Sequence, residues 1–143
     1  DLRELVAKVT GTLAEAFAAR KVEVVSRVDF AGPVVLDADR MLRALINLAD
    51  NARKAMPKGG TFTIATSKKG RSVLLEVTDT GVGMDKDVQR RLFEPFFTNS
   101  EEKGTGLGLC VVKNVVDAHG GKLTYTSEKG RGTTFRIAVP VAG

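Results

Sequence analysis

Two short segments contain the residues best suited to bind a ligand. In Asp79–Met84 an acidic residue ends an alternating apolar segment and is followed by Gly81 and Gly83. In Gly104–Leu109 three glycines precede a segment of helical periodicity. Glycines let a backbone approach a ligand closely, and unpaired N–H groups at the first turn of a helix bind anions. Together they indicate a nucleotide site, and the chain has neither a P-loop lysine motif nor a dinucleotide-binding GxGxxG motif.

Asp79 has the same strand parity as Val73, Leu75 and Val77, so we expect its carboxylate to face the core side of the sheet. A carboxylate there is costly unless its lone pairs are matched. The amino group of adenine would match them, whereas the oxo group of guanine would be repelled. The alternative is an aspartate that only caps the turn into Gly81. Asp79 alone does not separate these two interpretations, and the glycines at 81 and 83 favour the ligand.

A second polar set lies on a helix predicted from Asp37, a good N-cap, to about Met56. Asn47, Asn51 and Lys54 are spaced i, i+4 and i+7 and share one narrow sector of that helix. Two amides and an ammonium group could hold a metal-bound triphosphate. A single amide oxygen can suffice as the protein ligand of Mg²⁺ when the phosphates supply the negative charge. A solvated polar face is the common alternative. The predicted apolar stripe is separate and comprises Leu42, Leu45, Ile46, Ala49 and Met56.

Periodicity along the chain predicts the elements that position these residues. We expect helices over 2–19, 37–56, 85–93 and 106–118, strands over 21–28, 61–66, 73–78, 122–127 and 133–139, and an irregular loop over 94–105. Strand alternation yields one apolar and one polar face. The pattern predicts an α+β two-layer sandwich, a mixed β-sheet with helices on one face, in a single domain over residues 1–143.

Composition excludes several classes of protein. With 143 residues, 43% of them hydrophobic, the chain has the size of one ordinary domain with a core. No apolar run reaches the ~20 residues of a membrane span, so we expect this domain to be soluble. Cys110 and His119 are the only cysteine and histidine, which excludes an internal disulfide and a multi-histidine metal site. The net charge of +5 is scattered and aromatics are 6%, so nucleic acid is not an expected partner.

His119 is expected to be structural. It lies near the end of the last predicted helix, where Gly120 and Gly121 follow, so it should interact with the final carbonyls. A phosphorylated histidine would instead need an exposed helix face beside an acidic residue.

Four motifs occur in a characteristic order: Asn47-x-x-x-Asn51-Ala52, Asp79-x-Gly-x-Gly83, Phe93-Glu-Pro-Phe-Phe97 and Gly104-x-Gly-x-Gly108-Leu109. In this order they resemble the catalytic, ATP-binding domain of two-component sensor histidine kinases. That family belongs to the ATPase superfamily of gyrase, heat-shock chaperone, histidine kinase and MutL, which has the Bergerat-type sandwich. The resemblance covers essentially the whole chain, and residues 51–60 look most like the nitrogen-regulation subgroup.

The resemblance implies a role for each matching residue. Asn51 would be the Mg²⁺ ligand, Lys54 a phosphate contact, and Asn47 and Lys54 the catalytic candidates. Asp79 would read the adenine amino group, Gly81 and Gly83 would shape the adenine end, and the hydroxyl of Thr133 would help hold the base. Residues 94–105 would form a mobile lid that becomes ordered when nucleotide binds. Gly104, Gly106 and Gly108 would be its phosphate-facing hinge, and Thr105 and Leu107 would also contact the nucleotide.

One departure from the family lies in the lid. Related chains often read Phe-Phe-Thr-Thr-Lys where this one has Phe97-Thr-Asn-Ser100, so the lysine at the γ-phosphate is missing. Lys103 is the nearest cation that could replace it.

The function implied is that of a kinase module with ATP and Mg as cofactors. It would donate the γ-phosphoryl group to a histidine on a separate dimerisation domain of the same parent chain, and a response regulator receiver domain would follow. The chain opens on Asp1, so we expect a piece of a longer kinase, cytoplasmic, whose parent could be anchored in the inner membrane. An ATP-hydrolysing member of the superfamily and a non-catalytic ATP-sensing module are the alternatives. Asn47 disfavours the former, because hydrolysing relatives have a glutamate there and an amide cannot take a proton from water.

Overall fold

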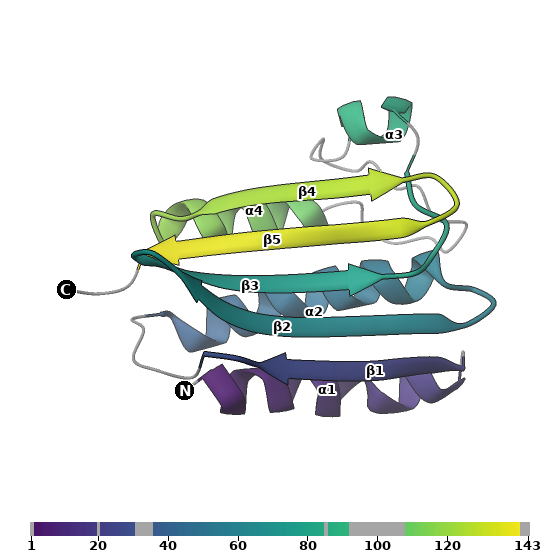
Figure 1. The fold of residues 1–143 in the computed structure, drawn as a ribbon, viewed down its shortest axis with the longest axis horizontal. Coiled ribbons are helices and arrows are strands. Elements are labelled where there is room, and N and C mark those ends of the chain that lie inside the picture. The colour runs from purple at the N-terminus through teal and green to yellow at the C-terminus, as the bar shows by residue number, and fades with distance from the viewer. Residues whose placement is uncertain (1, 20, 31–35, 85, 92–107, 141–143) are drawn as a thin grey trace.

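A five-stranded sheet covered on one face by helices forms the molecule (Figure 1). The structure is a computed structural model that describes residues 2–19, 21–30, 36–84, 86–91 and 108–140. The helices are α1 (Leu2–Ala19), α2 (Ala38–Ala55), α3 (Lys86–Arg91) and α4 (Gly108–Ala118). The strands are β1 (Val22–Val28), β2 (Gly60–Lys69), β3 (Ser72–Asp79), β4 (Lys122–Glu128) and β5 (Gly132–Pro140).

The strands lie in the order β1-β2-β3-β5-β4. β1 pairs with β2 in parallel, and all other neighbours are antiparallel. Helices α1, α2 and α4 lie on one face, and α3 lies beyond the β4 edge (Figure 1). The predicted α+β two-layer sandwich with a mixed sheet is confirmed.

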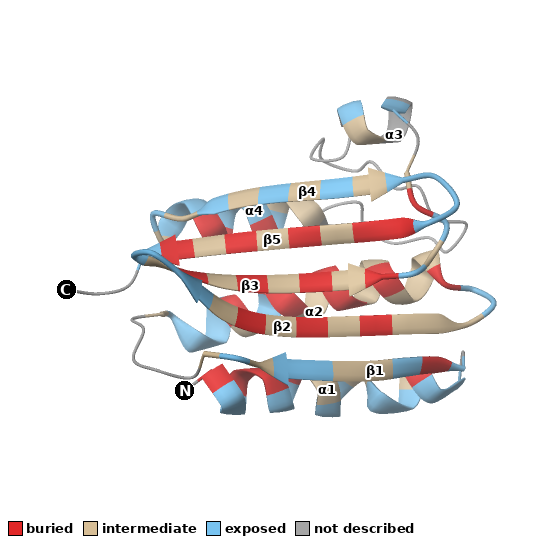
Figure 2. Ribbon diagram, viewed as in Figure 1, coloured by how far each residue is buried: buried red, intermediate tan, exposed pale blue. Residues whose placement is uncertain are grey.

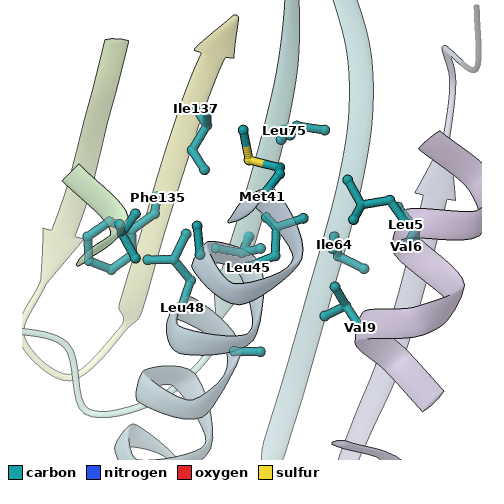
Figure 3. Close-up of a cluster of buried hydrophobic side chains, with 14 of the residues drawn as sticks. Leu5, Val6, Val9, Met41, Leu45, Leu48, Ile64, Leu75, Phe135 and Ile137 are labelled. Atoms are coloured by element: carbon teal, nitrogen blue, oxygen red, sulfur yellow. The ribbon is translucent and has the colours of Figure 1, made fainter. Parts of the chain in front are cut away.

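The core lies between the sheet and the three long helices (Figures 2 and 3). Strand alternation was predicted correctly: Phe62, Val77 and Ile137 face the helices, while Glu76 and Arg136 form an ion pair of 3.1 Å on the open face. Phe17 of α1 stacks on Phe62 of β2, with ring centroids 5.0 Å apart. These contacts anchor the α1–β1 segment to the remaining strands.

The apolar stripe of α2 differs from the prediction. Leu42 and Ile46 are only half-buried, at the margin of the helix face. The buried sector is wider because α2 packs against α1, α4 and the sheet together. Its members are Met41, Ala44, Leu45, Leu48, Ala49 and Ala52, and the C-cap residue Met56 is buried as well.

Local hydrogen bonds fix both ends of α2, and the predicted N-cap at Asp37 is confirmed. The Asp37 side chain accepts from the backbone N–H of Arg40 at 3.2 Å and caps the first turn. At the other end the Met56 N–H donates to the carbonyl of Arg53. Gly59 and Gly60, both with positive φ, then turn the chain into β2. None of the described helices has the length and apolar character needed to cross a membrane.

Candidate functional site

Asp79 ends β3 and is almost fully buried, with 7% of the residue exposed. Its Oδ1 accepts the Gly81 N–H at 2.9 Å, and the backbone N–H of Thr133 bonds the same carboxylate. Burial raises the pKa of Asp79 above its ordinary value, and the two backbone hydrogen bonds only partly oppose that rise. The side chain therefore both caps the turn and faces the helix side of the sheet, so the two interpretations of the sequence are compatible. It is a buried acceptor that a ligand N–H would stabilise further.

Thr133 of β5 lies directly across from Asp79 in the antiparallel pair. It is also 7% exposed, with its Oγ1 2.8 Å from the Oγ of Ser127 on β4. Ser127 Oγ in turn accepts the backbone N–H of Met84 at 2.8 Å. A carboxylate and a hydroxyl thus lie side by side on the helix face of the sheet. Such a pair can accept from an amino group and donate to a ring nitrogen, the pattern on one edge of adenine.

Ser127 is the residue of this group that sequence reasoning missed. It has the same parity as Leu123 and Tyr125 on β4, so its inward direction could have been read from the alternation. Its contact with Met84 could not have been read from the sequence, because the two residues are 43 positions apart.

The glycines beside Asp79 have packing partners within the protein. A Cβ at Gly81 would lie 2.3 Å from the Ala55 carbonyl oxygen, and one at Gly83 would lie 2.1 Å from that of Glu128. Val82 between them donates to the Ala55 carbonyl at 2.9 Å and accepts from the Gly130 N–H at 2.7 Å. The segment after Asp79 is therefore clamped between the end of α2 and the β4–β5 turn. Because packing accounts for both glycines, their role at a base stays a prediction.

The polar residues of α2 lie close to this segment, since Ala55 belongs to the last turn of that helix. Asn47, Asn51 and Lys54 are all half-buried. Within the described ranges, neither asparagine side chain makes a hydrogen bond, which leaves two amides able to bind a ligand.

Asp50 restrains Lys54, a contact that the sequence analysis missed. Lys54 Nζ lies 3.4 Å from Asp50 Oδ2, while Arg53 holds Oδ1 of the same carboxylate through Nε at 3.0 Å and Nη2 at 2.9 Å. Arg53 thus makes the closer contact, with two nitrogens on one carboxylate oxygen, and Lys54 makes the looser contact with the other oxygen. Lys54 can therefore turn toward an anion while Asp50 keeps its guanidinium partner.

Helix α4 starts near the same end of α2. The two helices pack side by side, and His119, just past the C-terminus of α4, contacts Asp37 at the N-terminus of α2. They are therefore antiparallel, and Gly108, the first residue of α4, lies level with the second half of α2 at about 1.5 Å per residue. The other residues predicted to contact the nucleotide near this helix, Lys103, Gly104, Thr105, Gly106 and Leu107, lie outside the described residues, as do the lid and the Phe93–Phe97 motif.

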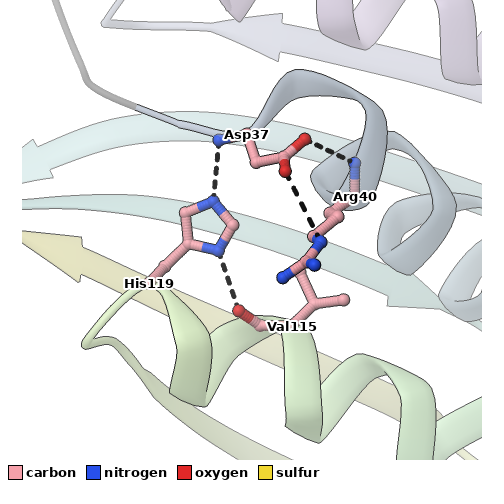
Figure 4. A network of polar contacts seen from close by, with 4 residues as sticks. All are labelled: Asp37, Arg40, Val115 and His119. Atoms are coloured by element: carbon pink, nitrogen blue, oxygen red, sulfur yellow. Dashed lines mark hydrogen bonds and ion pairs between the residues drawn. The ribbon is translucent and has the colours of Figure 1, made fainter.

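His119 joins the two helices through both ring nitrogens (Figure 4). Its Nδ1 lies 2.8 Å from the carbonyl oxygen of Val115, and its Nε2 accepts the backbone N–H of Asp37 at 2.9 Å. An Nε2 that accepts must carry a lone pair, so this geometry assigns the neutral tautomer with the proton on Nδ1. The predicted bond to the last helical carbonyls is confirmed, and the contact with Asp37 is new.

A shallow depression of about 300 Å³ opens at this end of the sheet. Asp79 and Thr133 contribute to its lining, but so do Thr78, Thr126 and Thr134, whose parity directs them away from the helices. The hollow therefore lies at the end of the sheet and is lined by residues of both faces. The alternation of β3 gives Asp79 the same buried parity as Val73, Leu75 and Val77, which places its side chain on the helix-covered face.

Two kinds of comparison identify the family of this chain. Residues 36–143 match the family described as "Histidine kinase-, DNA gyrase B-, and HSP90-like ATPase". The chain is 42% identical to the sensor histidine kinase ZraS of Escherichia coli over 105 residues, which cover 73% of this chain and 22% of ZraS. It is 36% identical to the sensor kinase CckA of Brucella abortus over 98% of this chain and 16% of CckA.

Solved structures agree with this fold. The catalytic domain of the histidine kinase ThkA superposes with a TM-score of 0.87 at 28% identity, covering 100% of this chain and 96% of that one. Full-length ShkA in complex with AMPPNP superposes with a TM-score of 0.89 at 29% identity, covering 99% of this chain and 30% of ShkA. The chain belongs to the histidine kinase-, DNA gyrase B- and HSP90-like ATPase family, as the four motifs predicted. The resemblance to the nitrogen-regulation subgroup stays a prediction.

Proposed function

We propose that this chain is the ATP-binding catalytic module of a sensor histidine kinase. It would bind Mg·ATP and present the γ-phosphate to a histidine on a separate domain. The observation that supports this most is Asp79, a buried acid on the helix-covered face of the sheet that lies opposite Thr133 in the β3–β5 pair. The chain spans 22% of ZraS and 16% of CckA, so the activity of the whole protein is part of the proposal.

The base would be recognised by the β3–β5 pair. Asp79 accepts from the adenine amino group, and Thr133 donates to the neighbouring ring nitrogen. Guanine presents an oxo group and a ring N–H at the same places, so both contacts would be lost. A site built around such hydrogen bonds can discriminate by about 10⁴.

The phosphates would lie along the second half of α2, toward the start of α4. Asn51 fits a magnesium ligand because its amide oxygen is a hard donor that makes no hydrogen bond within the described ranges. When bound, Mg²⁺ supplies charge neutralisation to the phosphate oxygens. Lys54 adds a second positive charge, and Asp50 keeps that ammonium group near the site. Gly108 and the glycines before it would contribute backbone N–H groups.

Catalysis would consist mainly of positioning the γ-phosphate for in-line attack and balancing its charge. Asn47 is one turn before Asn51, where a water-activating group would be needed for hydrolysis. Its amide cannot accept a proton, so we expect slow ATP hydrolysis. His119 does not qualify as the acceptor, because both of its ring nitrogens are engaged at the end of α4 that points away from Gly108.

The partners follow from this role. The acceptor histidine would belong to a dimerisation domain of the parent chain, and a response regulator receiver domain would take the phosphate from it. The histidine kinase ThkA has been solved in complex with the response regulator protein TrrA, which supports a response regulator as a partner. The module would work in the cytoplasm, where ATP is available.

A labelling experiment with γ-labelled ATP tests the proposal. The chain should bind Mg·ATP in calorimetry with clear preference over GTP, yet incorporate no phosphate alone. Acid-labile label should appear once a histidine-bearing helical domain of the parent is supplied in cis or in trans. Equal affinity for ATP and GTP would refute the adenine assignment. Label on the chain alone that disappears in His119→Gln would refute the role given to that residue.

A further inference from the structure

Ser127 lies where β4, β5 and the segment after Asp79 meet, and it has no role in the site described so far. Its Oγ contacts three atoms: the backbone N of Met84 at 2.8 Å, Thr133 Oγ1 at 2.8 Å and the Gly132 carbonyl oxygen at 3.3 Å. The side chain is half-buried on the helix face of the sheet. A hydroxyl has one proton and two lone pairs, so these contacts restrict its orientation.

The direction of the Ser127 proton decides what Thr133 can offer a ligand. The Met84 N–H occupies one lone pair of Ser127. Of the two oxygens that could take the proton, Thr133 Oγ1 lies within the usual O–H···O distance, and the Gly132 oxygen at 3.3 Å lies beyond it. When Ser127 donates to Thr133, the proton of Thr133 is free to point at a ligand. In the reverse orientation, Thr133 would donate its hydroxyl proton to Ser127 and could not donate it to a ligand.

We propose that Ser127 is a positioning residue that makes Thr133 a hydrogen-bond donor to the adenine ring nitrogen beside the amino group. This inference rests on the proposed function, since it concerns the same site. Ser127 fixes the polarity of the pair: Asp79 accepts, and Thr133 donates. Through Met84 it also ties this pair to the glycine-containing segment that is clamped against α2.

The test compares ATP with 1-deaza-ATP, which retains the amino group but lacks the ring nitrogen that Thr133 would meet. Ser127→Ala should weaken ATP binding about three- to tenfold, the range of one hydrogen bond. It should change 1-deaza-ATP binding by less than about twofold. Ser127→Thr keeps a hydroxyl and should restore ATP affinity.

A double-mutant cycle adds a second criterion. Thr133→Val should lower ATP affinity, and adding Ser127→Ala to it should cause no further loss, because Ser127 acts through Thr133. The matched control is Thr124→Val, which removes an exposed hydroxyl from β4, the strand that also bears Ser127. This variant should bind both nucleotides as tightly as the unsubstituted chain does.

Each outcome has a distinct meaning. Equal losses for ATP and 1-deaza-ATP in Ser127→Ala would make Ser127 merely structural and overturn the inference. Additive losses in the double variant would do the same. Failure of the unsubstituted chain to bind ATP would instead refute the proposed function.

Discussion

Replacing Asp79 by asparagine should separate the stability of this domain from its affinity for ATP. The substitution keeps the shape of the side chain but leaves one acceptor oxygen and adds an NH₂ donor. In the fold the carboxylate already serves the backbone N–H groups of Gly81 and Thr133. An amide cannot serve those donors and also accept from an adenine amino group.

The expected loss of binding follows from this conflict. If the amide oxygen stays on Gly81, the NH₂ group faces the adenine amino group, donor against donor. If the amide rotates, Gly81 loses its acceptor. Either way, one hydrogen bond to a charged group is lost and one buried donor is unpaired, at a cost of about 2–4 kcal/mol. ATP should therefore bind about 30- to 700-fold more weakly.

Unlike ATP affinity, the stability of the ligand-free fold should change little in this variant. Burial raises the pKa of Asp79 from its ordinary value of 3.8, so the folded state disfavours the ionised form. As the pH rises from about 4 through the raised pKa, the unfolded chain ionises first and the ligand-free fold loses stability. Asparagine does not titrate, so this loss is absent from the variant. At neutral pH we expect the free energy of unfolding to lie within about 1 kcal/mol of the parent, since one weakened hydrogen bond offsets the gain.

Urea unfolding across this pH range and calorimetry with Mg·ATP would measure the two quantities separately. The matched control is Glu76→Gln, an acid-to-amide change on the same strand but on the open face. It should leave ATP affinity unchanged. The reasoning would be refuted if Asp79→Asn bound ATP within about threefold of the parent. Destabilisation by several kcal/mol would show instead that the carboxylate is required as a turn cap.

Three further predictions concern the surrounding structure. Asn51→Ala should remove the Mg²⁺ requirement and most phosphoryl transfer while ADP binding persists, as calorimetry with and without EDTA would show; unchanged transfer would make Asn51 a surface residue. His119→Ala should cost about 1–3 kcal/mol in urea unfolding, because the contact between α2 and α4 loses two hydrogen bonds, one exposed and one part-buried. Gly83→Ala should destabilise more than Gly130→Ala: both have positive φ, but only at Gly83 would the Cβ strike backbone. Equal thermal melting of the two variants would contradict this explanation.

Much of the site could be predicted from local sequence. The inward direction of Asp79 and Thr133 follows from strand parity, and the helical sector of Asn47 and Asn51 follows from a period of 3.6 residues. The start of α2 was also readable, because the N-cap residue Asp37 acts on its immediate neighbours.

Contacts between distant segments could not be predicted in this way. The bond from the Asp37 backbone to His119 joins residues 82 positions apart, and nothing local to either residue indicates it. The clamp on Val82 and the link from Ser127 to Met84 depend in the same way on how α2, β3 and β4 meet. The width of the buried sector of α2 was missed because it depends on three packing partners rather than on the helix itself.

The pairing of β1 with β2 determines how far this domain can be shortened from its N-terminal side without disrupting the sheet. The family match begins at residue 36, yet Val22–Val28 is hydrogen-bonded along β2 and Phe17 covers Phe62. A polypeptide that started at residue 36 would keep every motif but turn β2 into an exposed edge, with unpaired backbone groups and an uncovered aromatic ring. Such edges recruit strands from other molecules. We therefore expect that shorter polypeptide to aggregate through β2, and the first 28 residues to act as an intramolecular shield against it.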